Sequence, residues 1–112
     1  MVYSTTHTFL NAATAASTGD VLKNINNTNL VVSVEGMFTG SISMQGYLGN
    51  EWHPVACVAL GGLTVSSAIT ASGVYTVVCP VAFEKIRANL TAIFAGSVTV
   101  IGRIYGGEAD VQ

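Results

Sequence analysis

Charged residues are scarce in this chain of 112 residues. Only 9% of them are Asp, Glu, Lys or Arg, against about 25% in an average soluble domain. Ser, Thr, Asn and Gly must therefore cover most of the surface, and such a surface is poor at keeping copies of a monomer apart. Because obligate interfaces are depleted in charge, the composition favours a chain that self-associates or docks on other subunits.

Clustered basic residues and long apolar runs are missing too. The four basic residues form no run and the formal net charge is −2, whereas nucleic-acid binding needs clustered Lys and Arg that replace counterions. Gly, Ser and Thr interrupt every apolar run, which excludes a transmembrane helix. We therefore predict neither a nucleic-acid nor a membrane partner. The first residues lack the basic and apolar regions of a signal peptide, so we expect synthesis in a cytoplasm without standard export.

Cysteine is rare, with only Cys57 and Cys79 present. The two can bridge adjacent strands of a sandwich, but without an export signal the favoured interpretation is two small buried hydrophobic side chains. No CxxC pair accompanies the isolated His7 and His53, so we predict no metal site and no cofactor.

A catalytic constellation is also missing. His53 and Cys57 share a strand face, but strand rise separates them by about 13 Å, too far for a catalytic hydrogen bond. No pair of acidic residues is marked out by its surroundings for glycoside hydrolysis. The sequence therefore predicts a protein that is not an enzyme.

What the chain does contain is a period-two pattern, clearest over residues 37–52. From residue 38 to 47, apolar residues or Gly at even positions alternate with polar residues or Tyr at odd positions. This alternation predicts a half-buried strand whose Phe38, Ile42 and Met44 lie in the core. Gly inside a strand predicts a bulge or a close backbone approach, with a large ring lying over the gap.

The same pattern recurs along the chain, separated by turn residues. Strands are predicted at 3–10, 20–25, 29–35, 38–47, 52–60, 63–70, 74–79, 83–90 and 97–105, with 11–19 as a loop. Short strands at regular spacing indicate a sandwich or barrel. The predicted fold is all-β, a single antiparallel β-sandwich of about eight strands, jelly-roll or immunoglobulin-like. One domain spans residues 1–112, with 1–28 as an N-terminal arm or edge strands and 106–112 as a loose tail.

Six residues are candidates for contact with a partner or a glycan: Tyr47, Trp52, His53, Arg87, Arg103 and Tyr105. The three aromatic residues can form a platform for sugar stacking, although large aromatic side chains are more often core. If the two late strands that carry the arginines pair, these side chains share one surface and meet a carboxylate or a neighbouring subunit. The histidine is interpreted as a surface or interface residue.

A series of short motifs follows one another from residue 29 on. In chain order they are Val34-Glu35-Gly36, Phe38 to Ile42, Gln45-Gly46, Gly49-Asn50, Trp52 to Val55, Gly73 to Val77, Ile86 to Asn89 and Gly96 to Val100. This order resembles a small β-sandwich module found in virion proteins of tailed bacteriophages. The two cysteines are not part of that pattern, and the turn before Trp52 is short.

The resemblance implies a non-enzymatic structural protein of a phage virion, made in the host cytoplasm, that decorates or stabilises the capsid through symmetric contacts. The implied partners are copies of the chain itself, as a homo-oligomer, and other virion proteins such as the major capsid protein. The alternative is a tail, baseplate or fibre module that binds a receptor or carbohydrate through exposed aromatic side chains.

Overall fold

The polypeptide is built mainly of strands joined by short turns. A computed structural model describes residues 3–23, 29–78, 80 and 83–106. Its strands are β1 (Tyr3–Ala13), β2 (Ser17–Thr18), β3 (Leu22–Lys23), β4 (Asn29–Glu35), β5 (Phe38–Leu48), β6 (Glu51–Pro54), β7 (Cys57–Ala59), β8 (Val65–Ser66), β9 (Gly73–Val77), β10 (Lys85–Gly96) and β11 (Val98–Gly106).

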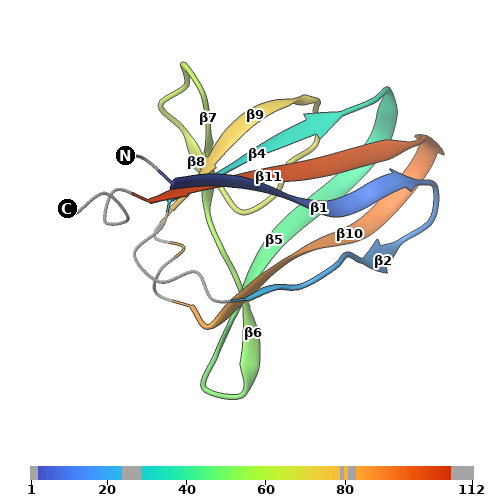
Figure 1. The fold of residues 1–112 in the computed structure, drawn as a ribbon. Coiled ribbons are helices and arrows are strands. Elements are labelled where there is room, and N and C mark those ends of the chain that lie inside the picture. Colours follow the sequence, from blue (N-terminus) through green and yellow to red (C-terminus); the bar gives the residue numbers. More distant parts are fainter. Residues whose placement is uncertain (1–2, 24–28, 79, 81–82, 107–112) are drawn as a thin grey trace.

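These strands form two sheets that pack face to face (Figure 1). The six-stranded sheet has the order β1-β11-β4-β9-β7-β8. The five-stranded sheet has the order β2-β10-β5-β6, and β3 also pairs with β10. Each pairing between described strands is antiparallel. The predicted all-β class and the antiparallel β-sandwich are therefore confirmed.

The core lies between the two sheets and is apolar. Strand β4 shows how it forms, since Leu30, Val32 and Val34 are buried while the alternate residues face outward. Burying a side chain of this size contributes about 1.5–3 kcal/mol. No polar or charged side chain is buried in the described ranges, so apolar packing rather than internal polar contacts holds these sheets together. The buried set is Phe9, Leu10, Leu30, Val32, Val34, Ile42, Met44, Val55, Cys57, Ile69, Val77, Ile86, Ala88, Leu90, Val98, Val100 and Ile104.

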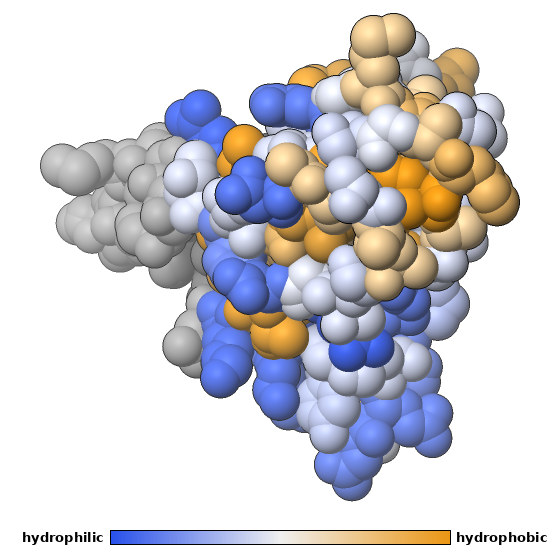
Figure 2. Space-filling view, turned by 90° about the vertical axis from the view of Figure 1, so that its right-hand side faces the viewer, coloured by the Kyte–Doolittle hydropathy of each residue, from blue (hydrophilic) through white to orange (hydrophobic). Residues whose placement is uncertain are grey.

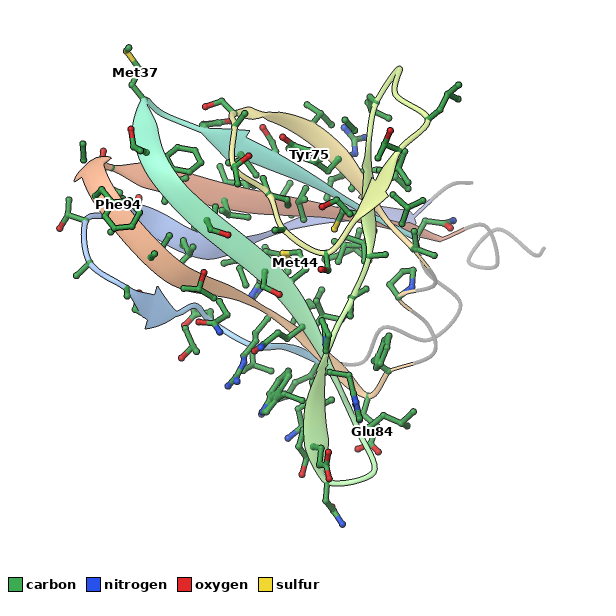
Figure 3. The ribbon with its side chains drawn as sticks, turned by 180° about the vertical axis from the view of Figure 1, so that it is seen from behind. Met37, Met44, Tyr75, Glu84 and Phe94 are labelled. Carbon is green, nitrogen blue, oxygen red and sulfur yellow. The ribbon has the colours of Figure 1, made fainter. Side chains whose placement is uncertain are left out.

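Strand β5 crosses the middle of the five-stranded sheet and carries the predicted core residues. Ile42 and Met44 are fully buried, and Phe38 is partly buried against the same cluster. Figure 3 shows Met44 between the two sheets. The half-buried strand predicted from the period-two pattern is thus confirmed.

The two glycines inside β5 have the roles that the sequence predicts. A Cβ atom at Gly46 would lie 2.3 Å from Cγ of Phe83, so the phenyl ring covers that glycine. A Cβ atom at Gly40 would lie 2.3 Å from the carbonyl oxygen of Ala92. There the register between β5 and β10 shifts between Leu90 and Ala92, which is a β-bulge. The absence of a side chain thus leaves space for the Phe83 ring at Gly46 and for the backbone of β10 at Gly40.

The prediction of one continuous strand over residues 52–60 is wrong. Strand β6 is the edge of the five-stranded sheet, whereas β7 lies inside the six-stranded sheet. The chain crosses between the sheets at Val55, whose amide donates to the Met44 carbonyl oxygen (2.9 Å), and Ala56, whose carbonyl oxygen accepts from the Val78 amide (2.9 Å). A segment with apolar residues on both of its faces thus marks a crossing between the two sheets here, rather than a central strand.

Several other boundaries also differ from the prediction. The loop predicted over 11–19 contains the end of β1 and all of β2. The strand predicted over 63–70 shrinks to β8 and a single bridge between Ile69 and Ile42. Strand β10 continues six residues beyond its predicted end at Leu90, because bulges keep it paired with β5.

The N-terminal segment supplies edges to both sheets. Strand β1 is the edge of the six-stranded sheet, and β2 and β3 pair with β10 at the margin of the other sheet. The turn predicted at 26–28, the tail beyond residue 106 and Cys79 lie outside the described residues. Among the described residues there is no helix of the length and hydropathy needed to cross a membrane.

One end of the sandwich carries exposed apolar side chains. The turns that follow β1, β4 and β10 all lie at this end, on the right of Figure 1. Met37 is 91% exposed in the β4–β5 turn and Phe94 is 80% exposed near the end of β10. The two turns touch, since the Ser97 amide donates to the Met37 carbonyl oxygen (3.3 Å). We call Met37 and Phe94 the apolar tip (Figure 3). Figure 2 faces this end and shows apolar side chains gathered over part of it.

Candidate functional site

The outer face of the five-stranded sheet brings aromatic and basic side chains together. Register places Lys23 opposite Lys85, Lys85 opposite Tyr47, and Tyr47 opposite Trp52, so these four form one row across β3, β10, β5 and β6. In the next row Arg87 lies opposite Gln45. Residues directly opposite on paired strands point to the same side of the sheet. We define the aromatic–basic face as Lys23, Gln45, Tyr47, Trp52, Lys85 and Arg87.

The two rings of this face contact each other, and each carries a cation. The ring centroids of Tyr47 and Trp52 are 5.2 Å apart and their planes are inclined by 59°. Nζ of Lys85 lies 4.6 Å from the Tyr47 ring centroid, and Cζ of Arg87 lies 4.0 Å from that of Trp52. A cation over an aromatic ring is attracted by the negative face of the π system. These contacts hold the two rings and the two cations in a defined arrangement.

Arg87 is also fixed by a hydrogen bond. Its Nε donates to Oε1 of Gln45 at 2.8 Å. This bond and the contact with Trp52 orient the guanidinium plane, so fewer rotamers of Arg87 remain open. A pre-organised guanidinium loses less conformational entropy when it forms further hydrogen bonds.

Charge of one sign dominates this face. Three of the four basic residues of the chain, all except Arg103, lie on it. None of the acidic residues that the structure describes is a member of this face, although Glu51 and Glu84 are the chain neighbours of Trp52 and Lys85 and the Glu84 amide donates to the Tyr47 carbonyl oxygen (2.9 Å). Asp20 lines the hollow between β1 and β2, Glu35 ends β4 of the other sheet, Glu51 pairs with Leu48 at the β5–β6 turn and Glu84 precedes β10.

The condition under which Arg87 and Arg103 would share one surface, the pairing of their two strands, is not met. Strand β10 pairs with β2, β3 and β5, whereas β11 pairs with β1 and β4. Arg103 is exposed on β11 between two buried residues, and therefore faces outward from the six-stranded sheet. A carboxylate partner was one expectation for the arginines, but the hydrogen-bond partner of Arg87 is the side-chain amide of Gln45.

Two of the three aromatic residues considered for a sugar-stacking platform lie together on this face. Tyr47 and Trp52 are in contact and partly exposed on the outer face, so the alternative of a core Trp52 is wrong. Tyr105 belongs to β11, where it pairs with Ser4 and Asn29 in the other sheet. Its strand therefore belongs to a different sheet from β5 and β6.

The two histidines make main-chain contacts. His53 lies on β6 opposite Gly46, and its Nε2 is 3.1 Å from the carbonyl oxygen of Leu48. Nε2 of His7 is 3.3 Å from the carbonyl oxygen of Asp20, and its ring meets Phe9 edge-on at 4.7 Å. No group of three or more His, Cys, Asp or Glu side chains with metal-binding geometry occurs among the described residues.

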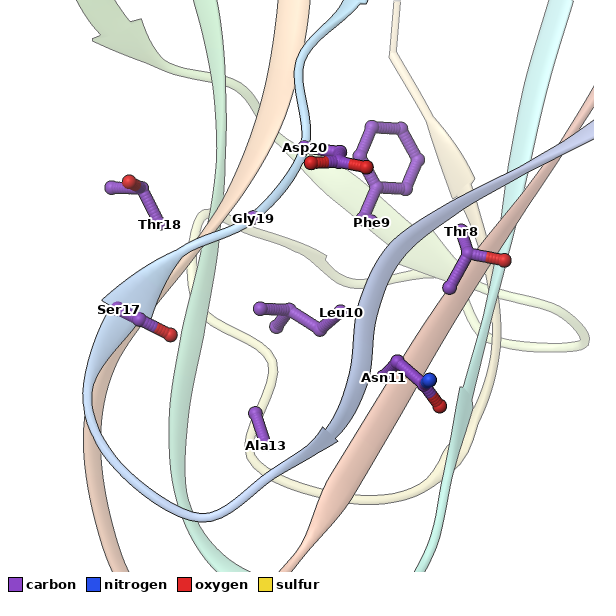
Figure 4. Close-up of a pocket in the computed structure, with 9 residues that line it drawn as sticks. All are labelled: Thr8, Phe9, Leu10, Asn11, Ala13, Ser17, Thr18, Gly19 and Asp20. Atoms are coloured by element: carbon purple, nitrogen blue, oxygen red, sulfur yellow. The ribbon is translucent and has the colours of Figure 1, made fainter.

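A hollow lies at the opposite edge of the fold, where β1 and β2 separate into different sheets (Figure 4). Its volume is about 530 Å³, and it is open. Leu10 and Ala13 lie between the two strands there, and polar side chains surround them. The lining consists of Thr8, Phe9, Leu10, Asn11, Ala13, Ser17, Thr18, Gly19 and Asp20. Asp20 is its single ionisable side chain, so a pair of acid and base groups is absent from this lining.

Sequence reasoning missed three members of the aromatic–basic face, namely Lys23, Gln45 and Lys85. Parity places Lys85 on the same side of its strand as Arg87, and Gln45 on the same side as Tyr47. What parity does not give is the strand order. Only the pairing of β10 with both β5 and β3 places Lys23, Lys85 and Arg87 on the same face of the sheet as the two rings.

Comparison with known proteins shows where the fold occurs. No protein-family model matches this chain, and neither does any curated protein sequence. Among solved structures, the SPBc2 prophage-derived protein YomS is 21% identical, with a TM-score of 0.85 over 95% of this chain and 96% of that one. The PBSX exported protein XepA is 19% identical, with a TM-score of 0.84 over 94% of this chain and 38% of that one. This chain therefore has the fold of nearly all of YomS and of less than half of XepA.

Proposed function

We propose that this chain is a non-enzymatic structural protein of a phage virion, which decorates or stabilises the capsid through symmetric contacts. The observation that carries the proposal is the fold shared with a prophage-derived protein over nearly the whole of both chains. The module resemblance of residues 34–100 supports the same origin. We further propose that the chain is made in the host cytoplasm and ends in the virion.

The surface supports a role in assembly. With 9% charged residues, the chain has few charges to repel copies of itself. Large apolar side chains are exposed at the apolar tip and again around the β7–β8 loop, where Leu60 and Leu63 are 62% and 97% exposed. Exposed apolar patches mark protein contacts. In an oligomer with closed symmetry, the same patch on each subunit makes the contact with its neighbour. The proposed partners are copies of this chain and other virion proteins such as the major capsid protein.

The chemistry of the described residues agrees with a structural role. Both histidines face main-chain carbonyl oxygens rather than a nucleophile or a carboxylate. Burial raises the pKa of the Cys57 thiol to about 11, which leaves the thiolate, its nucleophilic form, nearly absent near neutral pH. We propose no catalytic residue.

The test is the mass of the protein in solution and its binding to particles. Light scattering after size exclusion should give an oligomer, and the protein should co-sediment with phage capsids. The double variant Met37→Ser/Phe94→Ser should lose one or both properties while keeping its melting temperature, because neither side chain is packed in the core. Leu48→Ser, at an exposed apolar site that lies in neither of these two patches, is the control. A wild-type monomer that ignores particles at micromolar concentration contradicts the proposal.

A second candidate function is recognition of a receptor or carbohydrate by a tail, baseplate or fibre module. It is favoured by one observation, the contact between Tyr47 and Trp52 on an outer face rather than in the core. Glycan-array binding that is lost in a folded Trp52→Ala protein supports it. Equal binding by both proteins rules out the platform.

A further inference from the structure

We propose that the aromatic–basic face binds an acidic glycan, with a sugar ring on Tyr47 and Trp52 and its carboxylate or phosphate on Lys23, Lys85 and Arg87. The inference rests on the second candidate function and gives its ligand a chemical class. Three features of the face carry it: the placement of the charges, the free donors of Arg87, and the shape of the ring pair.

The positions of Lys23 and Lys85 suit the binding of an anion between them. Lys23 and Lys85 are direct register partners on β3 and β10, and like charges directly opposite each other destabilise a sheet. On its other side Lys85 faces Tyr47 rather than an acidic residue. In a purely structural role, one Glu in either position would turn repulsion into attraction. An anion bound between the two ammonium groups has the same effect.

Arg87 keeps donors for a ligand. The hydrogen bond that the structure gives it uses Nε alone, with Gln45 as acceptor. Within the described part of the chain, its other contact is the face of the Trp52 ring. The terminal nitrogens Nη1 and Nη2 are thus left as the pair of donors that carboxylate and phosphate accept in bidentate geometry. The same contacts set the direction in which that pair points.

The ring pair provides the apolar part of the site. Tyr47 and Trp52 are partly exposed neighbours with centroids 5.2 Å apart. Lys85 and Arg87 each cover one face of these rings, so a sugar stacks on the ring faces that stay exposed. An aromatic ring presents a flat apolar face and, in Tyr and Trp, a polar edge, which suits the C–H face and hydroxyl rim of a pyranose. The basic residues lie on the β10 side of these rings. A sugar stacked on the pair therefore points an acidic substituent toward them.

An acidic glycan fits this face better than a nucleic acid. Single-strand binding sites combine stacking rings with a basic groove that follows the backbone over several nucleotides. Here the basic side chains occupy two adjacent rows of a sheet, and the whole chain has a formal net charge of −2. This geometry contacts one or two anionic groups of a ligand and does not follow a charged backbone over several nucleotides.

The test measures binding of full-length protein to four immobilised probes: polygalacturonic acid, a phosphomannan, neutral dextran and single-stranded oligo(dT). We expect binding to one or both acidic glycans that weakens with added salt. Lys23→Ala and Arg87→Ala should each weaken it at least tenfold. Arg103→Ala removes the same charge from the other sheet and should change binding less than twofold. Lys23 touches neither ring, so its variant separates loss of charge from collapse of the ring pair.

The other outcomes distinguish failure of the ligand class from failure of the site. Dextran binding that needs Trp52 but is indifferent to Lys23→Ala and Arg87→Ala overturns the acidic ligand and keeps a carbohydrate site. If the protein binds none of the glycans, both the acidic ligand and the carbohydrate site are ruled out. Oligo(dT) that binds more tightly than either acidic glycan, with the same dependence on Arg87, replaces the glycan by a nucleic acid. The two acidic probes decide between carboxylate and phosphate.

Discussion

Replacing Gly46 by Ala tests the way in which β5 packs against the segment that leads into β10. The new Cβ atom would lie 2.3, 2.5 and 2.6 Å from Cγ, Cδ1 and Cδ2 of Phe83, whereas two carbon atoms in contact prefer about 3.5–4.0 Å. The ring must therefore retreat by about 1 Å, and from its root at Cγ rather than from its flexible end. Over-packing of this kind lowers stability by about 1–3 kcal/mol. At about 4 °C per kcal/mol for a domain of this size, the melting temperature should fall by about 4–12 °C.

The measurement is urea and thermal unfolding of four proteins that complete a double-mutant cycle. Once Phe83→Ala removes the ring, Gly46→Ala should be neutral, or stabilising by about 0.4–1 kcal/mol because Ala restricts the unfolded chain. The two substitutions should thus be strongly non-additive. A Gly46→Ala protein as stable as the parent, or an equal loss with and without the ring, would refute the view that Phe83 covers this glycine.

Three further predictions address the core and its margins. Burial raises the pKa of the Cys57 thiol from 9.0 to about 11. The stability linked to the protonated thiol is therefore present below pH 9 and is lost as the pH rises toward 11. Urea unfolding at a series of pH values should show this fall in the unfolding free energy, and the fall should be smaller in Cys57→Ala. Ile42→Ala, at a fully buried position, should lower the unfolding free energy by about 2–5 kcal/mol, whereas Thr39→Ala on the exposed side of β5 should lower it by less than about 1 kcal/mol. Tyr75→Phe removes the hydroxyl hydrogen bond to the Ala71 carbonyl oxygen (2.7 Å) and should cost about 0.5–1.5 kcal/mol in chemical unfolding.

Much of the fold can be read from the sequence, because β-strands alternate with a period of two. The strand over residues 29–35 has its predicted bounds, and β5 ends one residue later than predicted. Prediction fails where the chain changes sheets. Residues 52–60 look like one apolar strand, yet a crossing divides them at Val55, which is buried, and Ala56, which is partly buried. The bulges of β10 likewise leave no signal in a simple parity count.

The candidate site depends more on topology than on local pattern. Trp52 and Tyr47 are found from the sequence because both are large aromatic residues at the two ends of one turn, with Tyr47 on the polar parity of its strand. The arginines show what the alternation of side chains along a strand leaves open. Both sit on polar faces of late strands, but the strand order places Arg87 beside Trp52 and sends Arg103 to the other sheet. Strand order comes from long-range pairing, which a single sequence does not display.

The protein content of purified phage particles tests the proposed structural role most directly. Particles banded from the host that carries this gene are analysed by quantitative mass spectrometry, and antibody labelling in the electron microscope locates the chain. We predict a fixed number of copies per particle that survives washing, with label over the capsid. Complete, infectious particles that lack the chain, with all of it left in the cell fraction, would contradict the role proposed.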